Sequence, residues 1–292
     1  MAYEQSLVET DWLADHLQDE QLRLFDCTFF LARPRPAVGI AQTPQTGAER
    51  YWSEHIPGAA YIDVRRALAT QAVHSLSFPT AERVAETMTG LGVDADTQVV
   101  LYDSQGGMWA TRVWWILRAY GFDQAAVLNG GYAKWLAEER QTTTEAAAAH
   151  TGNFIAQPRS GMIATRAEVE AAMADEDTSL VNALGQPVYE GESAPYGRAG
   201  HIPTSVSVPS AATIDADTRT FLPDEELRAL FGEAGATEAG RVITYCGGGI
   251  AASVDAFLLT RLGHENVAIY DGSLSEWCAD PSLPLVTGSE AG

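Results

Sequence analysis

The chain has 292 residues, 46% hydrophobic and 20% charged, which is the composition of an ordinary globular domain protein. Its formal net charge of −21 argues against nucleic acid and anionic membrane surfaces as partners, because both bind clustered lysine and arginine. Three cysteines, no short-spaced metal pair, no apolar run of membrane-spanning length and no secretory signal predict a cytoplasmic protein without a disulfide scaffold or a metal site.

In the first half, short apolar runs alternate with longer segments of helical character. They predict strands at residues 22–25, 99–102 and 126–128 and helices at residues 84–91 and 109–120. Strands and helices in alternation are typical of a mostly parallel sheet with helices on both faces.

A segment without sustained periodicity follows. It contains three consecutive threonines, an alanine run, glycines and a proline. We expect residues 144–162 to be a linker between an N-terminal domain, 1–143, and a C-terminal domain, 163–292. Residues 146–149 could instead continue a helix.

The second half repeats the alternation of the first half. It predicts strands at residues 180–181, 242–245 and 267–270 and helices at residues 224–235 and 252–262. The sequence therefore predicts an α/β protein with two mostly parallel sheets flanked by helices.

The sequence also contains an internal repeat, because three short segments of the first half recur in the second half in the same order and at nearly constant spacing. The matched segments are residues 55–59 with 201–205, residues 99–103 with 242–246, and residues 128–135 with 270–277. One such match could arise by chance, whereas three in order indicate tandem domains.

Cys246 ends a predicted strand, and Gly247, Gly248, Gly249, Ile250 and Ala251 lead into a predicted helix. The free N–H groups of a helix start favour an anion, and a thiol in such surroundings ionises more readily. Glycines let the backbone amides approach the sulfur closely. This loop is therefore typical of one that holds a charged sulfur. The alternative is a buried structural cysteine beside a flexible turn.

The first half has Asp103 where the second half has Cys246, followed by a loop that is one residue longer. The N-terminal half therefore keeps the scaffold and lacks the thiol. We expect it to be catalytically inactive and to supply interface surface.

These residues together resemble the tandem-domain rhodanese family, which includes thiosulfate and 3-mercaptopyruvate sulfurtransferases. The resemblance covers nearly the whole chain. It depends on five segments: residues 55–59, 113–115, 128–131, 200–203 and the loop from Cys246.

The resemblance implies two rhodanese-like domains with the nucleophile in the C-terminal one. It implies that Cys246 takes a sulfane sulfur from a donor, becomes a persulfide and passes the sulfur to cyanide or a thiol. The amides of residues 247–251 would stabilise that persulfide, and no metal or organic cofactor would be needed.

The resemblance leaves the sulfur donor open between thiosulfate and a mercapto-acid. Asp63 and His74 match positions that line the cleft in the mercaptopyruvate type. That type also places arginines ahead of the second His-Ile-Pro motif to hold a carboxylate, and Arg198 is the one cation close to that stretch here, so it is the third candidate for substrate binding. Asp63 could instead cap a turn, and His74 could be an exposed loop residue. The oligomeric state is left open.

Two rivals differ in class from a sulfurtransferase. One is a non-catalytic rhodanese-like module that binds a partner or carries sulfur. The other is an arsenate or phosphate-ester enzyme on the same scaffold, although Ala252 stands where cysteine phosphatases need an arginine.

The remaining marked residues are expected to be structural. His55 and His201 recur in both halves and would hold a tight turn. Cys27 and Cys278 have no glycine loop and are expected to be spectators.

Overall fold

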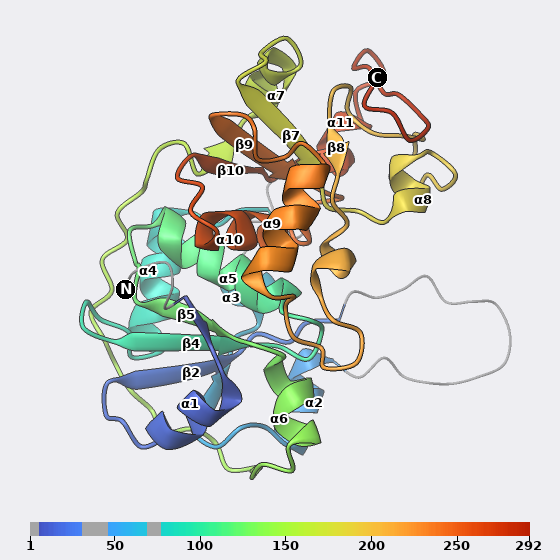
Figure 1. Ribbon diagram of the computed structural model, residues 1–292. Helices are drawn as coiled ribbons and strands as arrows, with labels where there is room; N and C mark the ends of the chain where they lie inside the picture. The colour runs from blue at the N-terminus through green and yellow to red at the C-terminus, as the bar shows by residue number, and fades with distance from the viewer. Residues whose placement is uncertain (1–5, 31–45, 69–76) are drawn as a thin grey trace, which may run out of the picture.

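Two separate five-stranded sheets form the framework of the computed structural model, which describes residues 6–30, 46–68 and 77–292 (Figure 1). Every pairing within both sheets is parallel. The strand orders are β1-β5-β4-β2-β3 and β6-β10-β9-β7-β8, so the second sheet repeats the topology of the first. The predicted α/β class and the tandem repeat are confirmed.

The strands of the first sheet are β1 Leu7–Val8, β2 Leu22–Asp26, β3 Ala59–Tyr61, β4 Gln98–Tyr102 and β5 Ala125–Leu128. Those of the second sheet are β6 Ile163–Ala164, β7 Thr178–Asn182, β8 Val206–Ser207, β9 Arg241–Tyr245 and β10 Val267–Tyr270. The central strands β4 and β9 are buried beyond their first residue, as expected for parallel strands covered by helices on both faces.

The N-terminal half contains helices α1 Thr10–His16, α2 Gly47–Ser53, α3 Val64–Ala67, α4 Ala81–Gly90, α5 Met108–Ala119 and α6 Gly131–Ala137. The C-terminal half contains α7 Arg166–Ala172, α8 Gln186–Tyr189, the 3-10 helix η2 Ser210–Thr213, α9 Asp224–Glu233, α10 Ala252–Arg261 and α11 Ser273–Trp277. All ten elements predicted above are present, with ends that differ by a few residues. The edge strands β1, β3, β6 and β8 escaped prediction because two or three residues carry no readable period. No described helix has the length and hydropathy needed to cross a membrane.

The segment between α6 and β6 contains neither helix nor strand, so the alternative of a helix at residues 146–149 is wrong. The segment packs back on the N-terminal half: the Gly152 amide donates to the Thr89 carbonyl at 2.9 Å, and the Gln157 amide to the Tyr120 carbonyl at 2.8 Å. The linker is therefore an ordered strap, and the domain limits at residues 143 and 163 stay predictions.

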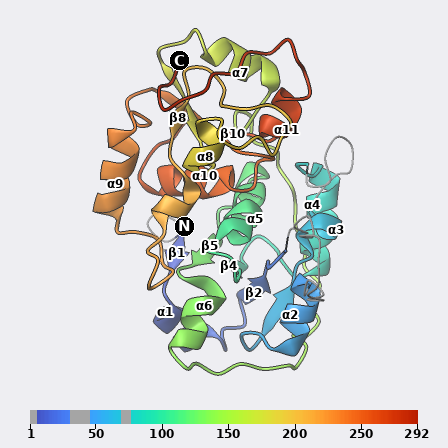
Figure 2. The same cartoon turned by 90° about the vertical axis from the view of Figure 1, so that its right-hand side faces the viewer.

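Helices α5 and α10 pack against each other between the two sheets (Figure 2). The rings of Trp114 and Phe257 meet edge to face there, with centroids 4.9 Å apart. One buried apolar cluster includes residues of both halves, and a single core therefore joins the two domains.

Two hydrogen bonds cross the interface at positions related by the repeat. The Phe78 amide donates to Asp271 Oδ2 at 2.8 Å, and the Phe221 amide donates to Asn129 Oδ1 at 2.9 Å. These two hydrogen bonds relate the domains by an approximate twofold symmetry.

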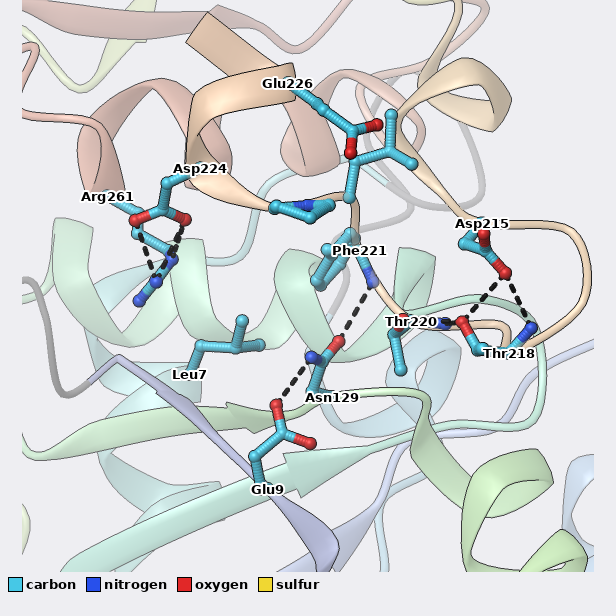
Figure 3. Close-up of a pocket in the computed structure, with 12 residues that line it drawn as sticks. Leu7, Glu9, Asn129, Asp215, Thr218, Thr220, Phe221, Asp224, Glu226 and Arg261 are labelled. Atoms are coloured by element: carbon cyan, nitrogen blue, oxygen red, sulfur yellow. Dashed lines mark hydrogen bonds and ion pairs between the residues drawn. The ribbon is translucent and has the colours of Figure 1, made fainter.

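The second of these hydrogen bonds borders an interdomain pocket of about 570 Å³ (Figure 3). Two pairs of its polar side chains are engaged with each other: Asn129 donates to Glu9 at 2.7 Å, and Arg261 pairs with Asp224 at 3.0 Å. Cys246 does not line this pocket.

The two histidines of the repeat are structural, as predicted. His55 Nδ1 lies 2.8 Å from the Tyr51 carbonyl oxygen, and His201 Nδ1 lies 2.8 Å from that of Tyr189. The His55 ring stacks on the Tyr51 ring and the His201 ring on the Tyr189 ring, with ring centroids 3.9 and 3.6 Å apart. Both side chains fix the turn that precedes an edge strand.

Candidate active site

Cys246 directly follows β9, and the loop of residues 246–251 connects this strand to α10. The cysteine is 3% exposed, whereas Gly248 and Ala251 are partly exposed. A Cβ added to Gly248 would meet no atom within 4 Å. Open space therefore borders the loop at Gly248, two residues after Cys246.

Ser273 at the start of α11 shapes this loop. Its hydroxyl oxygen accepts the Cys246 amide at 3.0 Å and the Gly249 amide at 3.1 Å, and its proton goes to the Tyr270 carbonyl at 2.8 Å. Ser273 is fully buried and has a φ of 50°, which is rare for a residue other than glycine. A strained backbone therefore places one hydroxyl where it joins both ends of the cysteine turn.

The other amides of the loop have no protein partner. Within the described part of the chain, the N–H groups of Gly247, Gly248, Ile250 and Ala251 donate to no backbone or side-chain acceptor. Neither does any described N–H donate to the Cys246 sulfur. A run of unengaged amides beside an open space is a site for an anion that comes from outside the protein.

Arg112 on α5 connects the N-terminal half to the cysteine loop. This side chain is 1% exposed and donates to Asp271 Oδ1 at 2.6 Å and to the Gly249 carbonyl at 3.3 Å. Gly249 has a φ of 75°, and a Cβ there would lie 2.6 Å from the Asp271 carboxylate. The N-terminal half and the backbone of Gly249 thus fit together at this point.

The three residues carried over as substrate-binding lie in different settings. Asp63 caps α3, accepting the Arg66 amide at 3.1 Å, and its carboxylate lies 3.8 Å from the Arg66 guanidinium. Arg198 donates to the carbonyls of Asp280 and Leu283 at 3.0 and 2.8 Å. His74 lies outside the described residues. The capping alternative for Asp63 is thus present, and a role of these residues with substrate stays a prediction.

Four residues at the loop were not picked out from the sequence: Arg112, Tyr196, Asp271 and Ser273. For two of them, the alignment of the two halves offered a signal, because the paired residues differ in type. Ser273 is aligned with Gly131, and Arg112 is aligned with Asp255. For Tyr196 no motif stood out. Its hydroxyl lies against Gly247, where an added Cβ would be 1.9 Å away.

The other two cysteines are buried, unpaired thiols outside this loop. Burial first, and then the charges of Asp26 and Asp103, raise the pKa of Cys27 well above its usual range. Burial likewise raises the pKa of Cys278. Both positions favour the neutral thiol, which agrees with a spectator role.

The repeat-related loop of the first half contains Asp103 and no thiol. Four backbone amides donate to its carboxylate, from Gln105, Gly107, Trp109 and Ala110, at 2.6 to 3.0 Å. The anion site of this half is therefore occupied by the chain itself. Among the described residues, no group of three or more His, Cys, Asp and Glu side chains is arranged to hold a metal ion.

Fold and loops together define a two-domain α/β protein. In one domain a cysteine lies beside amides that no described residue engages, and in the other the related loop contains a carboxylate that accepts four amides. The model of the rhodanese-like domain matches residues 9–138 and 165–280. The chain belongs to the rhodanese-like family, and each of its halves is one such domain.

Named relatives align along nearly the whole chain. A probable 3-mercaptopyruvate sulfurtransferase of Pseudomonas aeruginosa is 32% identical, over 97% of this chain and 98% of the relative. A thiosulfate sulfurtransferase of Rattus norvegicus is 30% identical, over 93% and 91%. The crystal structure of SseA from Escherichia coli, a 3-mercaptopyruvate sulfurtransferase, superimposes with a TM-score of 0.80 at 27% identity, covering 92% of this chain and 98% of SseA.

Proposed function

We propose that the protein is a sulfurtransferase in which Cys246 carries the transferred sulfur as a persulfide. The observation that carries this proposal is the row of unengaged amides at Gly247, Gly248, Ile250 and Ala251 beside an open space. A persulfide places its negative charge one atom beyond the cysteine sulfur, and these donors stabilise such a charge without any side chain.

The reaction has two halves. The Cys246 thiolate attacks the sulfane sulfur of the donor, a sulfur–sulfur bond forms, and the bond to the rest of the donor breaks. The electron pair leaves as sulfite from thiosulfate, or as an enolate from a mercapto-acid, which then takes a proton from water. Cyanide or a thiolate next attacks the outer sulfur and releases the Cys246 thiolate, so ping-pong kinetics are expected.

The sulfur donor is proposed to be thiosulfate or a mercapto-acid, the two donor types named among the relatives. The loop of residues 246–251 contains no lysine or arginine, which favours a donor held by backbone amides. Side-by-side kinetics with thiosulfate and 3-mercaptopyruvate will separate the two donors: the preferred one gives the higher kcat/KM.

Cys246 thus stands as the proposed nucleophile and residues 247–251 as the proposed persulfide cradle. A rhodanese-like module that only binds a partner would not need unengaged amides at a thiol. The relatives' sulfurtransferase names also favour the catalytic interpretation. We further propose small-molecule partners and a cytoplasmic location, in keeping with three unpaired cysteines.

Mass spectrometry after incubation with each donor tests the proposal. The wild-type protein should gain the mass of one sulfur, and Cys246→Ser should gain none. Cys278→Ser, which removes a buried thiol elsewhere, should gain sulfur like the wild type. No gain with either donor in the wild type would refute the proposed function.

A further inference from the structure

Tyr196 belongs to the segment that precedes His201, and its side chain lies against the cysteine loop. An added Cβ on Gly247 would be 1.9 Å from the Tyr196 hydroxyl oxygen and 2.2 Å from the adjoining ring carbon. The φ of Gly247 is outside the left-handed region, so its backbone does not itself require glycine. Gly247 is therefore needed for space, and the group that takes this space is a phenol.

The hydroxyl of Tyr196 is a proton donor without a protein acceptor. The ring is half-buried and packs on the C-terminal core. Burial first, and then the charge of Cys246, raise the pKa of Tyr196 to about 12, so the phenol is protonated at neutral pH. Among the described residues nothing accepts a hydrogen bond from it, whereas the Tyr189 and Tyr51 hydroxyls donate to backbone carbonyls at 2.5 and 2.7 Å.

The other side-chain donors at the cysteine loop are already engaged. Arg112 and Ser253 donate to the Gly249 carbonyl, and Ser275 donates to the Gly247 carbonyl. Residues 247–251 themselves are three glycines, an isoleucine and an alanine, and Arg198 donates to the carbonyls of Asp280 and Leu283. The Tyr196 hydroxyl lies beside Gly247, the residue next to Cys246, and is close enough to Cys246 for a charge there to raise the tyrosine pKa.

We propose that the Tyr196 hydroxyl is a catalytic residue that donates a hydrogen bond to the sulfur anion at Cys246, first to the thiolate and then to the persulfide. This proposal rests on the sulfurtransferase function above. It makes Gly247 and Tyr196 a matched pair, since the loop admits the hydroxyl only where it lacks a side chain.

The rate of alkylation of Cys246 by iodoacetamide as a function of pH tests the proposal without any sulfur donor. In Tyr196→Phe the midpoint of this profile should move up by about one pH unit, because a hydrogen bond to a charged group is lost. The kcat/KM for the preferred donor should fall about 10- to 100-fold. The melting temperature should stay close to that of the wild type.

Tyr189→Phe is the matched control, because it removes a hydroxyl that donates to a backbone carbonyl away from the loop. It should leave the alkylation midpoint unchanged. Gly247→Ala, which displaces the phenol, should reproduce the shift of Tyr196→Phe, and the double variant should add nothing further.

An unchanged alkylation profile in Tyr196→Phe would overturn the role of Tyr196, even if sulfur transfer itself is confirmed. A shifted profile in a protein that accepts no sulfur would support the hydrogen bond and refute the proposed function. The two failures are thus distinguished by different measurements.

Discussion

The two loops that follow the central strands β4 and β9 present backbone amides in the same way and engage them differently. In the N-terminal domain the Asp103 carboxylate accepts four of these amides. In the C-terminal domain the Cys246 sulfur accepts no amide from the described residues, and the Ser273 hydroxyl accepts two. The amides of Gly247, Gly248, Ile250 and Ala251 have no partner in the part of the chain that the structure describes. One scaffold therefore forms a closed anion site with its own carboxylate and an open one with a thiol.

The difference extends to the residues behind the loops. Gly131 and Ser273 correspond in the repeat and share a positive φ, 53° and 50°, but only the serine brings a hydroxyl. A loop with its own carboxylate has no need of that hydroxyl, whereas a loop centred on a thiol does. The two loops thus differ at no fewer than two positions related by the repeat.

The largest effect is expected from giving the second loop the residue of the first. Cys246→Asp should lower turnover at least about 1000-fold, as expected for loss of a nucleophile. Its carboxylate should engage the unoccupied amides, so its free energy of unfolding should be at least that of Cys246→Ser. Urea unfolding and donor kinetics measure both, and an Asp variant less stable than the Ser variant would contradict the anion site.

The contact of the N-terminal domain with the cysteine loop is tested at Arg112. Arg112→Met should lower the free energy of unfolding by about 3–5 kcal/mol, because it leaves a largely buried carboxylate at Asp271 without its partner. Arg118→Met on the same helix loses a pair with Asp123 that is partly exposed and should cost under about 1 kcal/mol. Equal losses in the two variants would argue against a special role of the interdomain pair.

The closed loop is tested by removing its carboxylate. Asp103→Ala should lower the free energy of unfolding by about 2–3 kcal/mol, since four loop amides lose their acceptor. Asp215→Ala removes a carboxylate that accepts two amides in an exposed turn, and it should cost under about 1 kcal/mol. Chemical unfolding of both variants measures the two losses. A loss of unfolding free energy for Asp103→Ala as small as that for Asp215→Ala would refute the stabilisation of the loop by the Asp103 carboxylate.

Substitutions at two neighbouring glycines compare a position with a left-handed backbone and no room for a side chain, Gly249, with a position that borders open space, Gly248. Gly249→Ala should cost about 1–3 kcal/mol, because it combines a φ of 75° with a contact 2.6 Å from Asp271. Gly248→Ala meets nothing within 4 Å and should change stability by less than about 0.5 kcal/mol. Thermal unfolding of the two variants measures both losses of stability. Equal losses would mean that Gly248 is not beside an open space.

An effect that is absent at acid pH and grows with rising pH is expected at Asp255, which corresponds in the repeat to Arg112. Neither of its carboxylate oxygens has a hydrogen-bond partner among the described residues, and burial raises its pKa well above the usual range. The folded protein then holds a proton that the unfolded chain releases above about pH 4, so the free energy of unfolding falls as the pH rises from there.

Asp255→Asn removes this titration. The variant should match the wild type near pH 3 and gain on it with rising pH, by about 1.4 kcal/mol for each pH unit from about pH 4 up to the raised pKa. Urea unfolding from pH 3 to pH 8 provides the measurement. Parallel curves for the two proteins would show that Asp255 titrates normally in the fold.

The sequence alone predicted the ten principal helices and strands, the internal repeat and the place of Cys246 at the end of a parallel strand. These features depend on local periodicity and on residues that are neighbours in the chain, both of which can be read directly. It could not predict that Ser273 joins the ends of the cysteine turn, that Arg112 reaches across the interface to Gly249, or that Tyr196 lies on Gly247. These residues meet only when β10, α5 and the segment before His201 converge on one loop. Which amides remain free for an anion was therefore decided by tertiary packing, because a backbone donor is engaged or left open by whichever distant side chain the fold brings beside it.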